Sequence, residues 1–207
     1  MDSTEQEIVW SARYRDAGDH YVFGTEPNRF LARNAALFSP GQTVLTVADG
    51  EGRNAVWLAQ LGLRVTATDI SPVAIAKAHK LAEEKQVAVG FVQADAVSWD
   101  YPRNCFDAVV GIFIQFATPV QRAAMFSGMK KALKSGGLLL LHGYTIKQLE
   151  YRTGGLSAPE NLYDAEILRQ AFKGFEIIQL EEYEDELEEG IGHKGRSALI
   201  SLIARKY

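Results

Sequence analysis

The chain has 207 residues, of which 47% are hydrophobic and 23% charged, and this balance predicts one globular domain and excludes a disordered or fibrous protein. No stretch of about 18 apolar residues predicts a membrane-spanning helix, and the polar start at residues 1–5 is unlike a signal peptide. A single cysteine, Cys105, excludes an intrachain disulfide. From these three observations together we expect a cytoplasmic protein without a membrane partner. The net charge of −4 argues against nucleic acid as a partner, because nucleic-acid binding requires a basic face.

Short apolar stretches alternate along the chain with stretches of helical spacing. The stretch 44–48 predicts the first strand, and 53–61 predicts a helix that Gly62 ends. Ser71 is a good N-cap residue, and Pro72 suits the first position of the following helix. We expect the other strands at 64–69, 87–92, 106–112, 138–142, 175–180 and 197–204, and the other helices over 72–84, 119–133 and 161–172.

This alternation predicts an α/β fold of the Rossmann-like, doubly wound type, with a mostly parallel sheet and helices on both faces. No helical pattern separates the last two strands, so one of them is expected to run antiparallel. The sequence contains no internal repeat and no low-complexity linker. We therefore expect a single domain over 1–207, in which 1–40 forms a helical lid segment and 41–207 the Rossmann-like core.

Acidic residues are concentrated in the segment 181–189. Such a run is typical of a solvated edge strand and loop. Its negative charge is expected to repel polyanions, which again disfavours nucleic acid as a partner.

The first turn from strand to helix, residues 48–55, is rich in glycine. Gly50 and Gly52 would allow a ligand to approach the backbone closely, and the following helix offers free N–H groups. Asp69 follows Gly50 by nineteen residues, at the end of the second strand, where a carboxylate suits ribose hydroxyls. The same pattern also matches a dinucleotide fingerprint or a simple tight turn.

Charge distinguishes the two ligands that this turn would suit, a dinucleotide with its pyrophosphate and S-adenosylmethionine. A pyrophosphate would lie beside Asp49 and Glu51, and neighbouring anions in a dry crevice cost free energy. S-adenosylmethionine has no phosphate and carries a sulfonium and an ammonium group, so it tolerates both carboxylates. Arg53 offsets part of the repulsion, and an NAD-binding oxidoreductase therefore remains an alternative.

Six segments together resemble one family. The chain is similar to the class I S-adenosylmethionine-dependent methyltransferases, and most of all to their tellurite-resistance and thiopurine-methyltransferase-like branch. The resemblance implies a seven-stranded sheet with an antiparallel last strand, and S-adenosyl-L-methionine as cofactor. The matching segments are YVFGTEPN at 21–28, DGEGRN at 49–54, ATDIS at 67–71, QADA at 93–96, FDAVV at 106–110 and LKSGG at 133–137.

The resemblance also implies roles for individual residues. Asp69 would hold the ribose, Ile70 would pack on the adenine, and Asp95 would lie near the exocyclic amine of the adenine. Gln115 would stand beside the sulfonium and the nucleophile. Capping of a turn is the alternative for Asp95, and satisfying backbone groups is the alternative for Gln115. The predicted cofactor-binding residues are Asp49, Gly50, Gly52, Asn54, Asp69, Ile70, Asp95 and Ala96.

The first motif departs from the pattern of this family. Thr46 stands where the family has an acid, and Ala48 stands where it has glycine. These changes are predicted to weaken cofactor binding, or to mark a protein that binds the cofactor without turnover. Asp49 is a candidate to restore the missing negative charge from a different position.

Three segments outside the cofactor motifs are candidates to contact the acceptor: 10–23, 142–155 and 189–196. Tyr144 ends a buried strand on the active side, and His193 lies in a glycine-rich turn, where it would titrate near neutrality or simply be exposed. With Gln115, these are the predicted catalytic residues. The four histidines lack a common metal-ligand spacing, so no metal is expected.

These observations predict a methyltransferase that acts on a small molecule and exists as a monomer or homodimer. The family analogy suggests a thiol or another chalcogen nucleophile as acceptor. An oxygen or nitrogen acceptor is the alternative that His193 as a base would favour.

Overall fold

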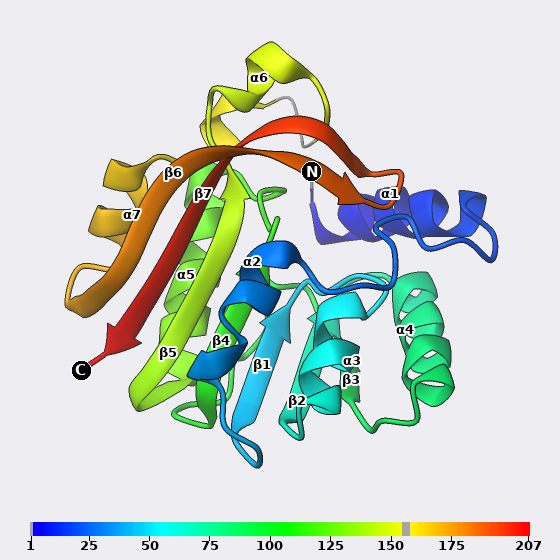
Figure 1. The fold of residues 1–207 in the computed structure, drawn as a ribbon, viewed down its shortest axis with the longest axis horizontal. Coiled ribbons are helices and arrows are strands. Elements are labelled where there is room, and N and C mark those ends of the chain that lie inside the picture. Colours follow the sequence, from blue (N-terminus) through cyan, green and yellow to red (C-terminus); the bar gives the residue numbers. More distant parts are fainter. Residues whose placement is uncertain (1, 155–157) are drawn as a thin grey trace.

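The computed structural model describes residues 2–154 and 158–207, which form a seven-stranded sheet with the strand order β3-β2-β1-β4-β5-β7-β6 (Figure 1). Strands β1 to β5 pair in parallel, whereas β7 is antiparallel to both of its neighbours, β5 and β6. This confirms the predicted fold class and its antiparallel strand. The strands are β1 Thr43–Val47, β2 Arg64–Asp69, β3 Gly90–Gln93, β4 Phe106–Ile112, β5 Leu133–Tyr144, β6 Phe175–Glu189 and β7 His193–Lys206.

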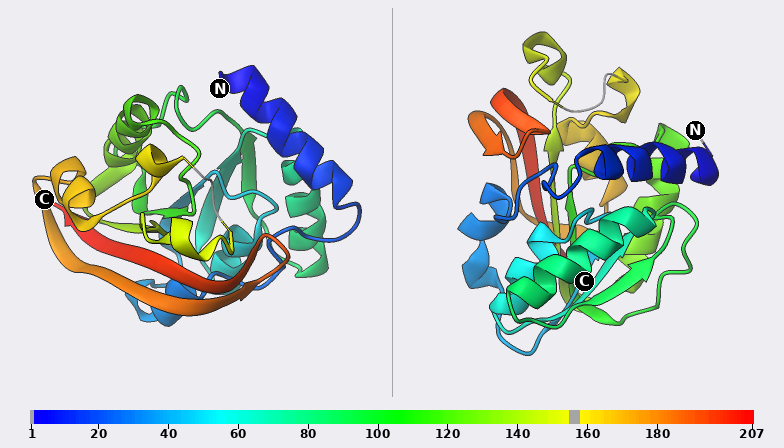
Figure 2. Two further views of the ribbon diagram at one scale, coloured as in Figure 1. Left: turned by 90° about the horizontal axis from the view of Figure 1, so that it is seen from above. Right: turned by 90° about the vertical axis from the view of Figure 1, so that its right-hand side faces the viewer.

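Helices cover both faces of the sheet (Figure 2). Helices α5 and α7 pack on one face, and α2 and α3 pack on the other, with α4 beside α3. No described helix is long and apolar enough to cross a membrane. The helices are α1 Ser3–Asp16, α2 Arg29–Arg33, α3 Arg53–Gln60, α4 Pro72–Glu84, α5 Pro119–Ala132, α6 Gln148–Tyr151 and α7 Ala165–Ala171, with short 3₁₀ turns at Ala35–Leu37 and Pro159–Asn161.

Two helices begin where their capping residues predict. The Ser71 hydroxyl accepts a hydrogen bond from the Ala74 amide at 3.2 Å, and Pro72 occupies the first turn of α4. Thr118 caps α5 in the same way, with Pro119 in its first turn. These caps place the start of each helix at the carboxyl edge of the sheet, where the preceding strand ends.

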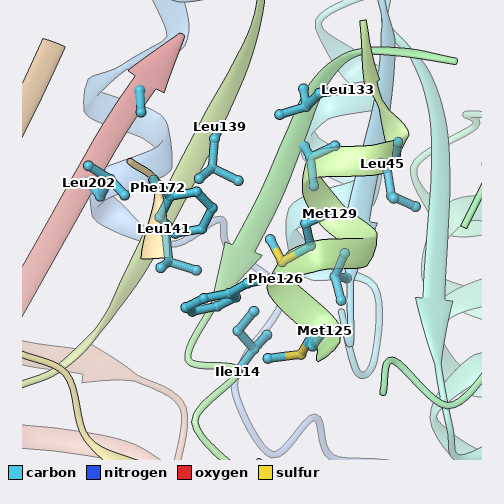
Figure 3. Packing of buried hydrophobic residues seen from close by; sticks show 14 of the residues in the cluster. Leu45, Ile114, Met125, Phe126, Met129, Leu133, Leu139, Leu141, Phe172 and Leu202 are labelled. Carbon is cyan, nitrogen blue, oxygen red and sulfur yellow. The ribbon is translucent and has the colours of Figure 1, made fainter. Parts of the chain in front are cut away.

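The largest hydrophobic core lies between the sheet and the α5–α7 face (Figure 3). Leu139 and Leu141 of β5 point into it from the sheet, opposite Phe126 and Met129 of α5. The unbroken apolar run of β5 is explained by burial of this strand on both of its faces, since Leu140 belongs to the core on the opposite face.

Several element boundaries differ from the sequence-based expectation. Strand β3 begins at Gly90 rather than at residue 87, and β5 begins at Leu133 because the chain passes directly from α5 into an irregular extension of the strand. The expected helix over 161–172 is shorter, and follows a separate 3₁₀ turn. Local propensity does not predict where the two strands begin, because pairing with neighbouring strands decides it.

The acidic segment 181–189 is part of β6, which forms an edge of the sheet as predicted, but strand pairing continues through its whole length. The expected loop is therefore wrong, and so is the expected solvation of its last residue: Glu189 is only 6% exposed. Pairing with the apolar strand β7 imposes an extended conformation that the acidic residues alone would not favour.

Candidate functional site

A single cavity brings together ten of the eleven predicted site residues. Its volume, including its opening to solvent, is about 1190 Å³. The cavity lies at the carboxyl ends of β1, β2 and β4, where helices switch from one face of the sheet to the other. The predicted residues that line it are Asp49, Gly50, Asn54, Asp69, Ile70, Asp95, Ala96, Gln115, Tyr144 and His193.

Helix α1 forms one wall of this cavity and lies across the carboxyl edge of the sheet (Figure 1). Gln6, Trp10, Arg13 and Tyr14 line the cavity from this helix. The helix begins with a capping box between Asp2 and Glu5, a local signal that explains its start. The sequence had placed Trp10 and Tyr14 in a candidate lid segment, whereas Gln6 and Arg13 had not been singled out.

The two glycines of the first turn have different roles. Both have a positive φ, 62° at Gly50 and 88° at Gly52, which disfavours any side chain. At Gly50 a Cβ atom would lie 2.8 Å from the Tyr14 hydroxyl, so only glycine lets α1 come this close. At Gly52 a Cβ atom would lie 2.7 Å from that of Ala78, which shows that Gly52 lets α3 pack on α4. Gly52 does not line the cavity, contrary to its predicted contact with the cofactor.

Asp69 ends β2 inside the cavity and is 7% exposed. Its Oδ2 atom accepts a hydrogen bond from the Gly50 amide at 2.8 Å, and its Oδ1 atom accepts one from the Ser71 amide at 2.9 Å. These bonds hold the carboxylate while leaving each oxygen capacity for another donor. Burial raises the pKa of Asp69 to about 6.

Asp49 lies beside the same cavity, and its Oδ2 atom accepts a hydrogen bond from the Ala55 amide at 3.1 Å in the first turn of α3. Burial raises the pKa of Asp49 to about 7. Asp49 and Asp69 thus place two carboxylates with raised pKa values at one cavity. In their charged form these two carboxylates suit a ligand with positive charge, such as S-adenosylmethionine, and disfavour an anionic pyrophosphate.

Glu51, in contrast, does not line the cavity. Its Oε2 atom accepts a hydrogen bond from the Val22 amide at 2.7 Å, and its Oε1 atom lies 2.5 Å from the Lys77 Nζ atom. The expectation that Glu51 would face a bound nucleotide is therefore wrong, because this carboxylate fastens the segment after α1 to α4. The electrostatic argument against a pyrophosphate then depends on Asp49 and Asp69.

Asp95, together with Ile70 and Ala96, lines another part of the cavity. The Asp95 carboxylate accepts hydrogen bonds from the Val97 amide at 2.9 Å and from the Ser3 hydroxyl of α1 at 2.5 Å. Burial raises the pKa of Asp95, but these hydrogen bonds outweigh it and lower the value overall. Asp95 therefore does cap the following turn, and it also ties α1 to the site.

Thr46 and Ala48, by which the first motif departs from the family pattern, each have an unusual local environment or conformation. The Thr46 hydroxyl is buried and has no hydrogen-bond partner among the described residues, so it does not replace the missing carboxylate. Ala48 has a φ of 50°, a left-handed conformation that favours glycine. Asn54 accepts a hydrogen bond from the Asn28 amide at 2.9 Å, which fixes the chain before α2 to the same loop.

The remaining part of the cavity is aromatic. Phe113, itself with a φ of 55°, packs its ring 4.2 Å from that of His193 and 4.6 Å from that of Tyr144. The Phe23 ring lies 4.5 Å from His193 on another side. Within the described part of the chain, neither the Tyr144 hydroxyl nor the His193 Nδ1 atom has a hydrogen-bond partner, although both are buried. Two unpaired polar groups in an aromatic cavity indicate a ligand with a polar atom at this point.

His193 differs from its prediction. It is the first residue of β7, 7% exposed, and not a solvent-exposed turn residue. Burial lowers the pKa of His193 well below 6.5, and the nearby cations Arg53 and Arg13 act in the same direction. The expectation that it titrates near neutrality is wrong, because the imidazole is neutral at that pH.

Gln115 lines the cavity, but its amide group is committed elsewhere. Its Nε2 atom donates to the Tyr144 carbonyl at 2.8 Å, and its Oε1 atom accepts from the Tyr144 amide at 2.6 Å. Gln115 therefore satisfies the backbone at the end of β5, which is the alternative that the sequence left open. It positions Tyr144 at the cavity.

Sequence reasoning missed a buried ion pair between Arg53 and Glu189, whose Nη2 and Oε2 atoms are 2.6 Å apart. Glu189 lies in the acidic segment that was expected to be solvated, so nothing in the local sequence pointed to its burial or to its pairing with Arg53. No group of three or more potential metal ligands occurs within the described ranges.

Comparisons with known proteins agree with this geometry. Residues 44–137 match the family described as a methyltransferase domain. An uncharacterized methyltransferase from Synechocystis is 34% identical over 121 residues, which cover 58% of this chain and 55% of that relative. The chain thus spans about half the length of this curated relative.

Two solved structures have a similar fold at low sequence identity. TehB from Haemophilus influenzae has a TM-score of 0.72 and 20% identity, covering 98% of this chain and 67% of that one. Magnesium protoporphyrin IX methyltransferase from Synechocystis, solved with bound SAH, has a TM-score of 0.74 and 18% identity over the full length of both chains. Residues 44–137 thus match a methyltransferase domain, the described residues have the fold of these two structures, and both findings agree with the resemblance that the motifs carry.

Proposed function

We propose that this chain transfers the methyl group of S-adenosylmethionine to a small-molecule acceptor. The observation that carries the proposal is one cavity with two chemically distinct parts. One part contains the carboxylates of Asp49 and Asp69, and the other contains an aromatic cluster with the unpaired Tyr144 hydroxyl and the neutral His193. A cation and a mostly apolar acceptor fit side by side in such a cavity.

On this proposal, Asp69 holds the ribose hydroxyls and Ile70 packs on the adenine. Asp49 lies toward the positively charged methionine part. When bound, S-adenosylmethionine supplies a methyl carbon that its sulfonium has already activated for in-line displacement. The chain contributes orientation and exclusion of water. Helix α1 serves both purposes, because Tyr14 lies directly against Gly50 and Trp10 lines the cavity.

For the acceptor, we propose a soft nucleophile such as a thiol or another chalcogen compound. The aromatic surroundings of Tyr144 and His193 support this choice, because sulfur makes favourable contacts with aromatic rings. An oxygen or nitrogen acceptor is a second candidate, which the neutral imidazole of His193 favours as a base.

A protein that binds the cofactor without turnover is the alternative from a different class. The unpaired hydroxyl of Thr46 and the left-handed backbone of Ala48 favour it, since both disturb the loop that faces the cofactor. The two functions differ in one measurable respect: a binding protein retains S-adenosylmethionine unchanged with every acceptor offered.

Calorimetric titration with S-adenosylmethionine and its demethylated product, with NAD as the control, tests the proposal. We expect a Kd in the micromolar range, about −8 kcal/mol, for the sulfur compounds and no binding of NAD. Asp69→Asn should weaken binding by about 2 kcal/mol, roughly 30-fold, because it removes the charge that accepts the ribose hydrogen bonds. Asp100→Asn, an exposed surface change, should bind normally. Binding of NAD instead, or equal affinity of the Asp69 variant, would contradict the proposed site.

A further inference from the structure

Glu189 is a buried carboxylate with an unusually complete set of donors. Its Oε2 atom lies 2.6 Å from Arg53 Nη2, and the Asn28 Nδ2 atom donates to both carboxylate oxygens at 3.0 and 3.1 Å. The Arg29 amide donates to Oε1 at 3.2 Å. Donors from α3 and from the start of α2 thus hold this end of β6. Burial raises the pKa of Glu189, but Arg53 and these hydrogen bonds outweigh it, so the carboxylate is ionised.

His193 stands directly across the hairpin from this carboxylate. Residues 189 and 193 are paired in register, and the Glu189 Oε2 atom lies 4.0 Å from His193 Nδ1. Both side chains are less than a tenth exposed. The His193 Nδ1 atom is buried without a hydrogen-bond partner within the described residues, and the Phe23 and Phe113 rings pack against the imidazole.

Other charged or titratable groups also face His193. Arg53 of α3 and Arg13 of α1 are cations nearby, and His142 and Tyr144 approach from β5. The cations oppose protonation of the imidazole. An ionised carboxylate opposite Nδ1 favours the neutral tautomer that carries its proton on Nδ1, and this leaves the lone pair on Nε2.

We propose that His193 is a general base whose Nε2 atom takes a proton from the methyl acceptor, and that Glu189 is the positioning residue that fixes the tautomer of the His193 ring. The proposal rests on the methyl transfer proposed above and adds a substrate class. The acceptor enters as a protonated X–H compound, not as a thioether or another nucleophile without a proton.

The proton balance of the step is simple. The X–H bond breaks, its proton goes to Nε2, and its electron pair forms the new X–CH₃ bond, while the donor sulfur keeps the electrons of the broken C–S bond. His193 then returns the proton to water.

The tautomer is measured without any substrate, by ¹⁵N NMR of the histidine rings in the full chain. We expect a protonated Nδ1 and an unprotonated Nε2 for His193, assigned through the loss of its signals in His193→Gln. Glu189→Gln should shift the population toward protonation at Nε2. Glu186→Gln, an exposed change on the same strand, should leave the tautomer as it is. A wild-type ring protonated at Nε2 would overturn the proposal.

Thiols that differ in their ionisation test the chemical role. A nitro-substituted arenethiol is already a thiolate at neutral pH, whereas an alkanethiol with a pKa of about 8.5 is protonated. His193→Gln should lower kcat/KM for the alkanethiol by about 10²-fold or more and change that for the arenethiol far less. Glu189→Gln should follow the same pattern with a smaller loss.

Two outcomes separate failure of this inference from failure of the proposed function. Equal losses for both thiols in His193→Gln mean that the residue only shapes the cavity, which overturns the base. If the wild-type chain binds S-adenosylmethionine but methylates no acceptor, the proposed function fails, and the NMR experiment still decides how Glu189 orients His193.

Discussion

Ala48 adopts a left-handed backbone conformation at the first turn, with a φ of 50°. An alanine in this region has steric strain that glycine does not have, and this cost lies next to the cofactor side of the cavity. The strain belongs to the folded state, so relieving it should increase the free energy of unfolding directly.

We expect Ala48→Gly to stabilise the chain by about 1 kcal/mol, which corresponds to a rise in Tm of roughly 3 °C for a domain of this size. The same change at Ala76, an exposed residue in the interior of helix α4, should destabilise by a similar amount, because glycine weakens a helix interior. Thermal unfolding of both variants checks the prediction. Destabilisation by both changes would show that Ala48 is not strained.

The two cavity carboxylates predict how binding depends on pH. In the free chain burial raises the pKa of Asp49 to about 7 and of Asp69 to about 6, so both are partly protonated near pH 6. A bound cation favours the charged form and lowers both pKa values. Binding of S-adenosylmethionine should therefore release protons near pH 6, and its affinity should fall as pH falls through this range.

We expect the Kd to rise by about tenfold between about pH 7.5 and pH 5.5, equivalent to about one unit of pKa shift. Calorimetry in two buffers of different ionisation enthalpy measures the released protons. Asp49→Asn should abolish part of this release. Proton uptake, or a Kd independent of pH, would contradict the raised pKa values.

At the scale of elements, two acidic residues hold the segments that cover the site. Glu51 joins the segment after α1 to Lys77 of α4, and Glu189 joins the β6–β7 hairpin to α3 and to the start of α2. Lys77 in turn donates to the carbonyls of Tyr14 and His20. The position of α1 over the cavity thus depends on a charge pair that makes no contact with the cavity.

Glu51→Gln should destabilise the chain by about 3 kcal/mol, because it leaves the partly buried Lys77 ammonium without its partner. Glu51→Gln combined with Lys77→Met should recover part of this loss. Urea unfolding of both variants, and of Lys77→Met alone, gives the free energies. A double variant as unstable as the sum of the single changes would show that the two groups are not coupled.

At the scale of the whole molecule, one sheet connects the core to the site. Leu141 of β5 is fully buried in the largest core, and three residues further along the same strand Tyr144 lines the cavity. Strand β7 pairs with β5 along this length and brings His193 to the same end. Packing of the core and geometry of the site are therefore linked through these two strands.

Leu141→Ala should lower the free energy of unfolding by about 2–5 kcal/mol, because it leaves a cavity in a close-packed core. Val120→Ala, at a side chain that is 83% exposed, should change stability by no more than about 0.5 kcal/mol. Chemical denaturation followed by circular dichroism measures both changes. A small effect at Leu141 would indicate that the core collapses around the gap.

The sequence by itself determined the order of the strands and of the main helices between them, and with it the fold class, while the cofactor roles of the site residues stay predictions. These features depend on signals that are local in the chain: apolar runs, the cap at Ser71 with Pro72, and the glycine turn followed by Asp69. The lid role of residues 1–40 and the choice between monomer and homodimer stay predictions.

Only the tertiary structure decided which charged residues face the cavity. In the sequence Glu51 looks like an acid that faces the ligand and Glu189 like a solvated acid, yet each is buried against a cation from a distant part of the chain. His193 looks like an exposed turn residue, and pairing of β6 with β7 buries it among aromatic rings. The physical reason is that burial and charge pairing depend on contacts between segments far apart in the chain, which local patterns do not encode.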